Sequence, residues 1–369
     1  MFGGFSEKYI PRGVASMPET AVVYTPKFLN HNPGPHHPES PKRLQAIMKD
    51  LNRSDLFKTE KCSLIEPKRA NTDDLKLVHA SDYIQLVKGC CESGGGLLDL
   101  GDTTVSPRSF ETALFAVGGA LTAVNLVMAG EVKSAFALVR PPGHHAGPYY
   151  AMGFCLFNNV AVAAAHLIKR HGADRVLILD IDAHHGNGTQ EIFYDTDEVL
   201  YISLHEDPTG FPGTGFADET GLGKGRGFTV NIPFPFRTDD EIYLKAVKEI
   251  VVPIVQQYEP QFILVSVGFD GHYTDPVGEL ALSASCYLKT TSYILQLASR
   301  LCRRKLVAVL EGGYSLSHIG EMATAVVAEM AGVSYTLRDA PAVASPDINK
   351  RAERVLREVK SIQSSMWDL

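Results

Sequence analysis

The sequence is poor in cysteine, and this scarcity argues against two classes of protein. Six cysteines occur among 369 residues, none of them in a Cys-x-x-Cys pair, and Cys90 and Cys91 are adjacent. Adjacent cysteines suit neither an ordinary disulfide nor a structural zinc site, so a disulfide-stapled secreted domain and a zinc-finger-type domain are both disfavoured. We expect reduced thiols and a cytoplasmic location.

Targeting signals and basic runs are also missing. Met1–Ile10 lacks the basic start and apolar run of a signal peptide, and the longest strongly apolar stretches are interrupted before membrane-spanning length. No run of Lys and Arg is long enough to line a nucleic-acid groove, and the net charge is −7 with a sequence pI near 6.0. We therefore expect neither a membrane nor a nucleic acid as partner, and the oligomeric state stays unknown.

Short apolar runs alternate with amphipathic, helix-like segments along the whole chain, without internal repeats or low-complexity linkers. Such alternation predicts an α/β fold, with a mostly parallel sheet covered by helices on both faces. We expect a single domain over residues 1–369, with its core at about 20–332 and a helical extension at about 345–365. The predicted strands are Ala21–Tyr24, Ala135–Val139, Val176–Leu179, Val199–Ser203, Phe228–Ile232, Phe262–Val267 and Leu306–Leu310. The predicted helices are Pro41–Leu51, Asp82–Glu92, Ser109–Met128, Asn158–Arg170, Asp239–Gln257, Ser285–Cys302, Leu316–Met330 and Ile348–Ser361.

The segment Val176–Asn187, VLILDIDAHHGN, carries the strongest chemical signal. Asp180, Asp182 and His184 stand at alternate positions after a buried strand, so in an extended backbone they point to one face. Burying such a cluster is costly unless a cation sits beside it, and carboxylate oxygen with imidazole nitrogen suits a divalent metal. The alternative is a strand-end loop whose polar groups face water.

Five predicted strand ends carry polar groups, in the segments RPPGHH, DIDAHHG, LHED, FDGHYTDP and EGGY. In a parallel sheet these ends meet along one edge, where open α/β sheets place their sites. Asp270 would then add a second carboxylate beside Asp182 and His184, leaving a coordination position open as in catalytic metal sites. The alternative for Asp270 is a turn-forming residue.

Further residues fit a hydrolytic site. His144 and His145 could supply a base near neutral pH, with Asp180 and Asn187 as hydrogen-bond partners that orient the two rings. Tyr314 follows two glycines and could stabilise an oxyanion. Aromatic residues in glycine-rich loops could line a narrow apolar channel, namely Phe154 and Phe211. The alternatives are a core histidine, a packed loop tyrosine and aromatic plugs over the edge of the core.

Taken together, the segments RPPGHHA, GFCLFNN, DIDAHHGNG, FPGTG, GFDGHYTDPVG and EGGY resemble the zinc-dependent deacetylase family. This family includes histone deacetylases, acetylpolyamine amidohydrolases and acetoin-utilisation proteins, and Asn187 resembles the class II branch. The resemblance runs from His37–Leu44 to EGGYSL. It implies an arginase-like three-layer α/β/α fold with a mostly parallel eight-stranded sheet, and hydrolysis of an acyl group from lysine in a peptide or protein, or from a related acylated amine.

The resemblance also implies a role for individual residues. Asp182, His184 and Asp270 would hold zinc, with iron possible in the cell, and His145 would be the general base and acid beside His144. Tyr314 would bind the oxyanion. The substrate-binding residues would be Gly153, Phe154, Phe211 and the rim residue Asp102, whose spacing is one residue off. Potassium would bind an inner site at Asp180, Ser203 and Leu204 with carbonyls of Asp182 and His184, and a second site at Phe193, Thr196, Val199 and Phe228.

Two alternative functions differ in class. A two-manganese ureohydrolase needs extra carboxylates, but Gly186 and His272 stand at the corresponding positions. A non-catalytic acyl-ligand sensor would not need the complete set of His144, His145 and Tyr314. Within the deacetylases, Val277 replaces the Glu that marks some polyamine-selective relatives. An acetylpolyamine or small-metabolite substrate thereby becomes the second choice.

Overall fold

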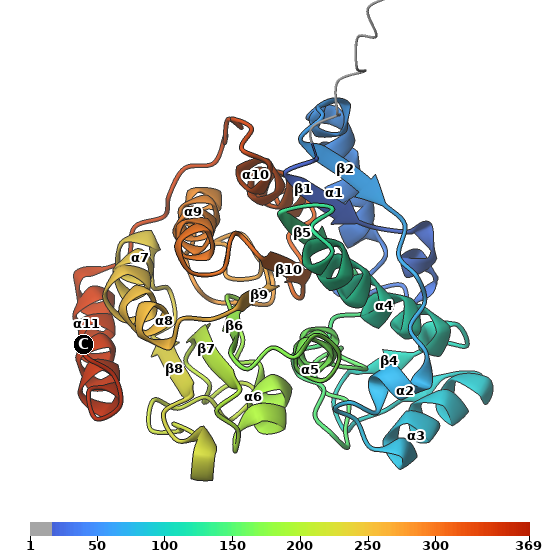
Figure 1. Ribbon diagram of the computed structural model, residues 1–369, viewed down its shortest axis with the longest axis horizontal. Helices are drawn as coiled ribbons and strands as arrows, with labels where there is room; N and C mark the ends of the chain where they lie inside the picture. The colour runs from blue at the N-terminus through green and yellow to red at the C-terminus, as the bar shows by residue number, and fades with distance from the viewer. Residues whose placement is uncertain (1–16) are drawn as a thin grey trace, which may run out of the picture.

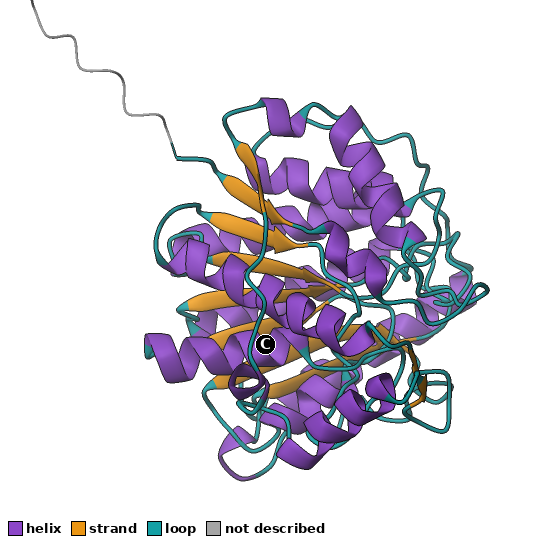
Figure 2. Cartoon of the chain, turned by 90° about the vertical axis from the view of Figure 1, so that its right-hand side faces the viewer, coloured by secondary structure: helices purple, strands orange, loops and turns teal. Residues whose placement is uncertain are grey.

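The computed structural model describes residues 17–369 and is built on one eight-stranded sheet (Figures 1 and 2). Its strands are β1 (Thr20–Val23), β2 (Cys62–Ile65), β5 (Ser134–Ala137), β6 (Val176–Asp180), β7 (Val199–Glu206), β8 (Thr229–Phe234), β9 (Phe262–Val267) and β10 (Leu306–Leu310). Their order is β2-β1-β5-β10-β9-β6-β7-β8, and every neighbouring pair is parallel. The predicted fold class is confirmed. A small antiparallel hairpin joins β3 (Gly96–Leu97) and β4 (Thr104–Val105).

Helices cover both faces of the sheet, as the two ribbon views show. They are α1 (Lys42–Arg53), α2 (Thr72–Leu75), α3 (Ser81–Glu92), α4 (Ser109–Met128), α5 (Asn159–His171), α6 (Asn187–Phe193), α7 (Asp240–Ala246), α8 (Val252–Tyr258), α9 (Ala284–Leu301), α10 (Ile319–Ala331) and α11 (Pro346–Gln363). Helices α4 and α5 pack on the central strands, while α10 packs against both α1 and α9. The carboxyl-terminal helix α11 lies against β8 and α7.

The central strands are apolar because both of their faces are covered. All five residues of β6 and all five of β10 are buried, and so are all six of β9. Continuous apolar runs of this kind are typical of parallel sheets with helices on both sides. The polar residue Asp180, which ends β6, is therefore carried into the protein interior at the carboxyl edge of the sheet.

The structure differs from the predicted elements at three places. Strand β2 was not predicted, because Cys62–Ile65 is a short edge strand in which only Cys62 is buried. The predicted helix Asp239–Gln257 is two α-helices joined by a π-helical turn at Val247–Val251. Helix α6 was not predicted either, because it is only seven residues long.

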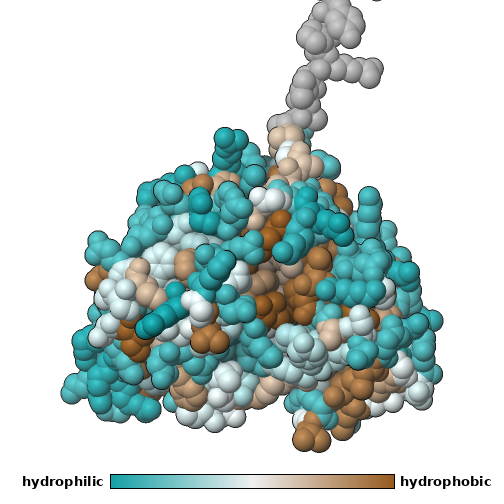
Figure 3. All heavy atoms as spheres, turned by 60° about the horizontal axis from the view of Figure 1, so that its bottom comes forward, coloured by the Kyte–Doolittle hydropathy of each residue, from teal (hydrophilic) through white to brown (hydrophobic). Residues whose placement is uncertain are grey.

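Helix α4 corrects the interpretation of the apolar stretches. It is 20 residues long and apolar enough to cross a membrane by length and composition, but 72% of its most apolar window is buried inside the protein. We therefore describe α4 as a core helix. The face drawn in Figure 3 is largely hydrophilic, with its apolar residues in separate patches. The signal-peptide prediction concerns Met1–Ile10, which lie outside the described residues.

A buried cluster of charges ties the amino-terminal part of the fold to the edge of the sheet. The Glu39 carboxylate accepts hydrogen bonds from Arg140 Nη2 at 2.6 Å and Arg43 Nη1 at 3.1 Å, and all three side chains are fully buried. Arg43 Nε in turn donates to the Gly313 carbonyl at 2.6 Å. The Glu39 carboxylate thus neutralises the buried charge of Arg43, and Arg43 holds the loop that follows β10.

Candidate metal centre and active site

The five polar strand ends come from five neighbouring strands. In the sheet order β5-β10-β9-β6-β7 these strands are contiguous. The loops that follow them carry His144 and His145, Tyr314, Asp270, Asp182 and His184, and Glu206 closes β7. The prediction that these ends meet along one edge of the sheet is confirmed.

Three of the predicted residues form a compact group of possible metal ligands. One ligand atom each from Asp182, His184 and Asp270 lies within 4.8 Å of the other two, and all three residues are buried. His184 Nδ1 is 3.3 Å from Asp182 Oδ1 and 3.3 Å from Asp270 Oδ2. The two carboxylates thus present one oxygen each to the same imidazole nitrogen.

The remaining carboxylate oxygens are held by backbone amides. Asp182 Oδ2 accepts from Gly312 N at 2.8 Å, and Asp270 Oδ1 accepts from Ala183 N at 2.9 Å. Apart from the approach of His184 Nδ1 to 3.3 Å, the buried Asp270 Oδ2 has no hydrogen-bond partner among the described residues. A buried, unpartnered carboxylate oxygen is costly unless a cation neutralises it. The group therefore fits a divalent ion bound by two carboxylates and one imidazole.

Close backbone approach makes this geometry possible. A Cβ at Gly312 would lie 2.1 Å from Asp270 Oδ2, and a Cβ at Gly268 would lie 1.9 Å from Asp182 Oδ2. Any side chain at either position would displace a carboxylate. Close packing against Asp270 therefore requires a glycine at position 312, the first glycine of the EGGY segment.

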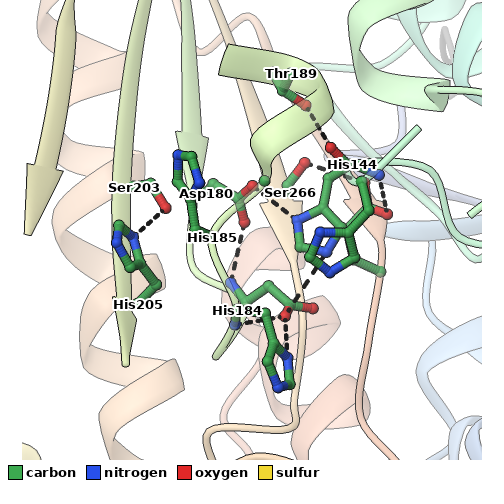
Figure 4. Close-up of polar contacts among 12 residues, drawn as sticks. His144, Asp180, His184, His185, Thr189, Ser203, His205 and Ser266 are labelled. Carbon is green, nitrogen blue, oxygen red and sulfur yellow. Dashed lines mark hydrogen bonds and ion pairs between the residues drawn. The ribbon is translucent and has the colours of Figure 1, made fainter. Parts of the chain in front are cut away.

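The tandem histidines have different hydrogen-bond partners (Figure 4 shows His144). His144 Nδ1 lies 3.0 Å from Asp180 Oδ2, whereas His145 Nδ1 lies 2.7 Å from Asn187 Oδ1, and the two rings are 4.0 Å apart. Burial would lower the pKa of His144, but Asp180 and Asp182 outweigh burial and raise that pKa to about 10. Burial, together with His144 and His184, holds the pKa of His145 well below its usual value. The pair is thus polarised, with the charge favoured on His144.

Glu311 supports the tandem-histidine loop, although sequence reasoning gave it no role. Its Oε2 accepts from Gly143 N at 2.7 Å and from His144 N at 3.2 Å, and its Oε1 accepts from Ser266 Oγ at 3.1 Å. His144, Cys155 and Glu311 also lie close enough to share an ion. Burial raises the pKa of the Cys155 thiol well above its usual value, which makes Cys155 a poor ligand.

Tyr314 is fixed by three neighbours. Asp275 Oδ2 accepts from Tyr314 N at 2.6 Å, Arg43 lies over the tyrosine ring at 4.9 Å, and Phe154 packs edge-on at 5.8 Å. Burial raises the pKa of Tyr314 well above its usual value, so its hydroxyl stays protonated and able to donate a hydrogen bond. Arg43 and Asp275 were not predicted, because neither directly follows a predicted strand.

These residues surround one cavity of about 290 Å³. Of the predicted residues, it is lined by Asp102, His145, Gly153, Phe154, His184, Phe211 and Tyr314. Val277, which the sequence analysis connected with substrate choice, also lines it, and the residues that were not predicted are Glu206, Gly210, Phe236 and Glu279. A Cβ at Gly153, which has a φ of +54°, would lie 2.5 Å from His145 Cδ2, so a side chain there would press on this ring. The cavity therefore reaches one of the three candidate metal ligands, His184, and is walled by the aromatic residues Phe154 and Phe211.

The residues predicted for potassium lie on β7 and on the segments next to it. Asp180 and Ser203 are register partners on β6 and β7, and Leu204 follows Ser203. Asp180 Oδ1 already accepts from Asp182 N at 3.2 Å, and Ser203 Oγ is 2.7 Å from His205 Nδ1 (Figure 4). The second set consists of Phe193 at the end of α6, Thr196, Val199 at the start of β7, and Phe228, whose carbonyl accepts from Tyr201 N. Potassium binding stays a prediction.

Comparison with known proteins adds an independent finding. The histone deacetylase domain matches residues 37–330. A probable deacetylase of Archaeoglobus fulgidus is 41% identical over 357 residues, covering 94% of this chain and 98% of that protein. A histone deacetylase-like amidohydrolase of Pseudomonas aeruginosa is 37% identical, covering 87% and 88%. The crystal structure of the HDA15 HD domain aligns with a TM-score of 0.85 and 37% identity, covering 95% and 96%.

Proposed function

This chain belongs to the histone deacetylase family, and on that premise we propose that it is a zinc-dependent amidohydrolase that removes an acetyl or other acyl group from lysine side chains or a related acylated amine. The observation that carries the proposal is the cavity shared by His145, His184, Tyr314 and the aromatic residues Phe154 and Phe211. A flat acylamide on an unbranched stem would fit between the two rings. Its carbonyl would then reach Tyr314.

Asp182, His184 and Asp270 would hold the metal, as zinc or, in the cell, iron. When bound, such an ion acts as a Lewis acid on the carbonyl and lowers the pKa of water at its open position. The buried Asp270 Oδ2, which apart from His184 lacks a hydrogen-bond partner among the described residues, supports this assignment. Structural or modulating potassium at the sites described above belongs to the same proposal.

Residues of the chain would transfer the protons and stabilise the charge that develops during the reaction. His145 would accept a proton at Nε2 and return it to the leaving amine, since its Nδ1 is engaged by Asn187. His144, whose charged form Asp180 favours, would act electrostatically. The Tyr314 hydroxyl would donate a hydrogen bond to the carbonyl oxygen as negative charge develops there.

Comparing the turnover of the His145→Ala and His144→Ala variants tests whether His145 is the base and His144 acts electrostatically. Metal content is measured in each variant. Since a positioned base contributes about 10²–10⁴-fold, we expect His145→Ala to nearly abolish turnover while metal stays bound. The His144→Ala variant should lose less activity. A larger loss in His144→Ala, at equal metal content, would reverse the assignment of the base. Absence of turnover by the metal-loaded wild type on a broad acylamide panel would favour the sensor alternative.

A second candidate substrate is an acylated polyamine or another small amine with an additional positive charge. Three carboxylates line the cavity, those of Asp102, Glu206 and Glu279, and the chain is acidic overall. Such a cluster would favour a cation at the entrance. Comparing kcat/KM for acyl-lysine peptides with that for acetylated polyamines distinguishes the two. Preference for the peptides would exclude this candidate as the main substrate class.

A further inference from the structure

We propose that Tyr150 and Glu191 are positioning residues that set the tautomer of His145 by fixing the orientation of the Asn187 side chain. The inference deepens the proposed function, on which it rests for its kinetic consequence. The starting observation is a chain of three hydrogen bonds that leads away from the cavity. His145 Nδ1 is 2.7 Å from Asn187 Oδ1, Asn187 Nδ2 is 3.1 Å from the Tyr150 hydroxyl, and that hydroxyl is 2.6 Å from Glu191 Oε2.

The direction of each hydrogen bond follows from Glu191, the residue at the end of the chain farthest from His145. An ionised Glu191 carboxylate can only accept, so the Tyr150 hydroxyl must donate to it. The Tyr150 oxygen then accepts from the Asn187 amide, which places the NH₂ group of Asn187 toward Tyr150 and its carbonyl oxygen toward His145. Since that oxygen can only accept, Nδ1 of His145 must carry the proton. The lone pair of a neutral His145 is thereby left on Nε2.

A neutral Asn187 needs the hydrogen bond to Tyr150 because its side-chain amide could otherwise rotate by about 180° and exchange its oxygen and nitrogen. With the oxygen and nitrogen exchanged, Asn187 would donate to Nδ1 and favour the opposite tautomer of His145. An aspartate at this position would accept with either oxygen and would need no such support. His144 illustrates the difference, because its own partner is the carboxylate of Asp180.

The local structure keeps the side chains of Asn187, Tyr150 and Glu191 close to one another. Asn187 and Glu191 are separated by one helical turn on α6, so both can face the same hydroxyl. The Asn187 amide has a second acceptor in Met152 Sδ at 3.5 Å, which favours the same orientation. Tyr150 packs closely on Gly147, where a Cβ would lie 2.4 Å from the ring. Neither Tyr150 nor Glu191 lines the cavity, so they would act only through Asn187.

A double-variant cycle tests the proposal in the zinc-loaded enzyme. We expect Tyr150→Phe to lower kcat roughly 3–10-fold with KM unchanged, the range expected for losing one hydrogen bond. In an Asn187→Asp background the same Tyr150→Phe change should alter kcat less than about 2-fold, since the aspartate needs no orienting partner. The matched control is Tyr149→Phe, because the neighbouring Tyr149 is 73% exposed and should not alter the rate.

Nitrogen-15 NMR of histidine-labelled protein gives a readout independent of turnover. We expect His145 to carry its proton on Nδ1 in the wild type and in both variants that contain Asn187→Asp, and to show a mixture of tautomers in the Tyr150→Phe single variant. A Tyr150→Phe variant that keeps a pure Nδ1–H tautomer would overturn the proposal. Equal rate losses from Tyr150→Phe with and without Asn187→Asp would also overturn it, as a purely structural effect. If the wild type hydrolyses no acylamide, the proposed function fails while the NMR result still decides this inference.

Discussion

Replacing Glu39 with glutamine should destabilise the fold strongly, although the two side chains have nearly the same shape. The Glu39 carboxylate is fully buried between the guanidinium groups of Arg140 and Arg43, and His31 Nε2 lies 3.5 Å away. The Glu39→Gln variant would leave two buried arginines without their counter-charge. Removing one partner from a buried ion pair typically costs about 3–5 kcal/mol.

The pKa of Glu39 gives a second route to the same magnitude. Burial alone would raise this pKa, but the Arg140 guanidinium, with His31 and Arg43, outweighs burial and lowers it from 4.5 to about 2. At about 1.4 kcal/mol per pH unit, this difference corresponds to roughly 3 kcal/mol of native stability. Because the native pKa is the lower one, the contribution is complete above about pH 4.5 and is lost as pH falls toward 2.

The assay is urea unfolding of metal-loaded protein at pH 7, repeated at lower pH. The matched control is Glu66→Gln, because Glu66 is 67% exposed in a surface ion pair with Lys27 at 3.7 Å, and such pairs are worth about 0–1 kcal/mol. We expect Glu39→Gln to lose about 3 kcal/mol more than the control at pH 7, with the gap narrowing in acid. A gap below about 1 kcal/mol, or one that does not depend on pH, would refute the reasoning.

Three further predictions concern the site. Tyr314→Phe should lower kcat about 10²–10³-fold while metal content and thermal stability stay near wild type; an unchanged rate on a good substrate would remove Tyr314 from the mechanism. Asp270→Asn should lower bound metal, measured by elemental analysis after dialysis, from one equivalent per chain in the wild type. Full retention of metal would contradict its role as a ligand. Phe154→Ala and Phe211→Ala should each raise KM for acyl-lysine substrates more than they lower kcat; unaltered KM in both would argue against the aromatic channel.

The sequence by itself determined the sheet and the place of the site. Apolar runs that end in polar groups are local signals, and parallel strands align their carboxyl ends regardless of loop details. This is why Asp182, His184 and Asp270 could be predicted to converge, and the structure brings their ligand atoms within 4.8 Å of one another. Edge strand β2 escaped prediction because it is short and partly exposed. The assignment of ligand and catalytic roles stays a prediction for the experiments above.

Only the tertiary structure decided which polar side chains support the site. Arg43 reaches the carbonyl of Gly313, 270 residues away in sequence, and Asp275 binds the backbone of Tyr314. Tyr150 likewise meets Asn187 from a separate loop. Such partnerships have no periodicity that could be read from the sequence, because they depend on how loops from different strands pack over the edge of the sheet. Burial makes the Arg43 contact the most costly of these to lose, since an unpaired polar group in the interior is unfavourable.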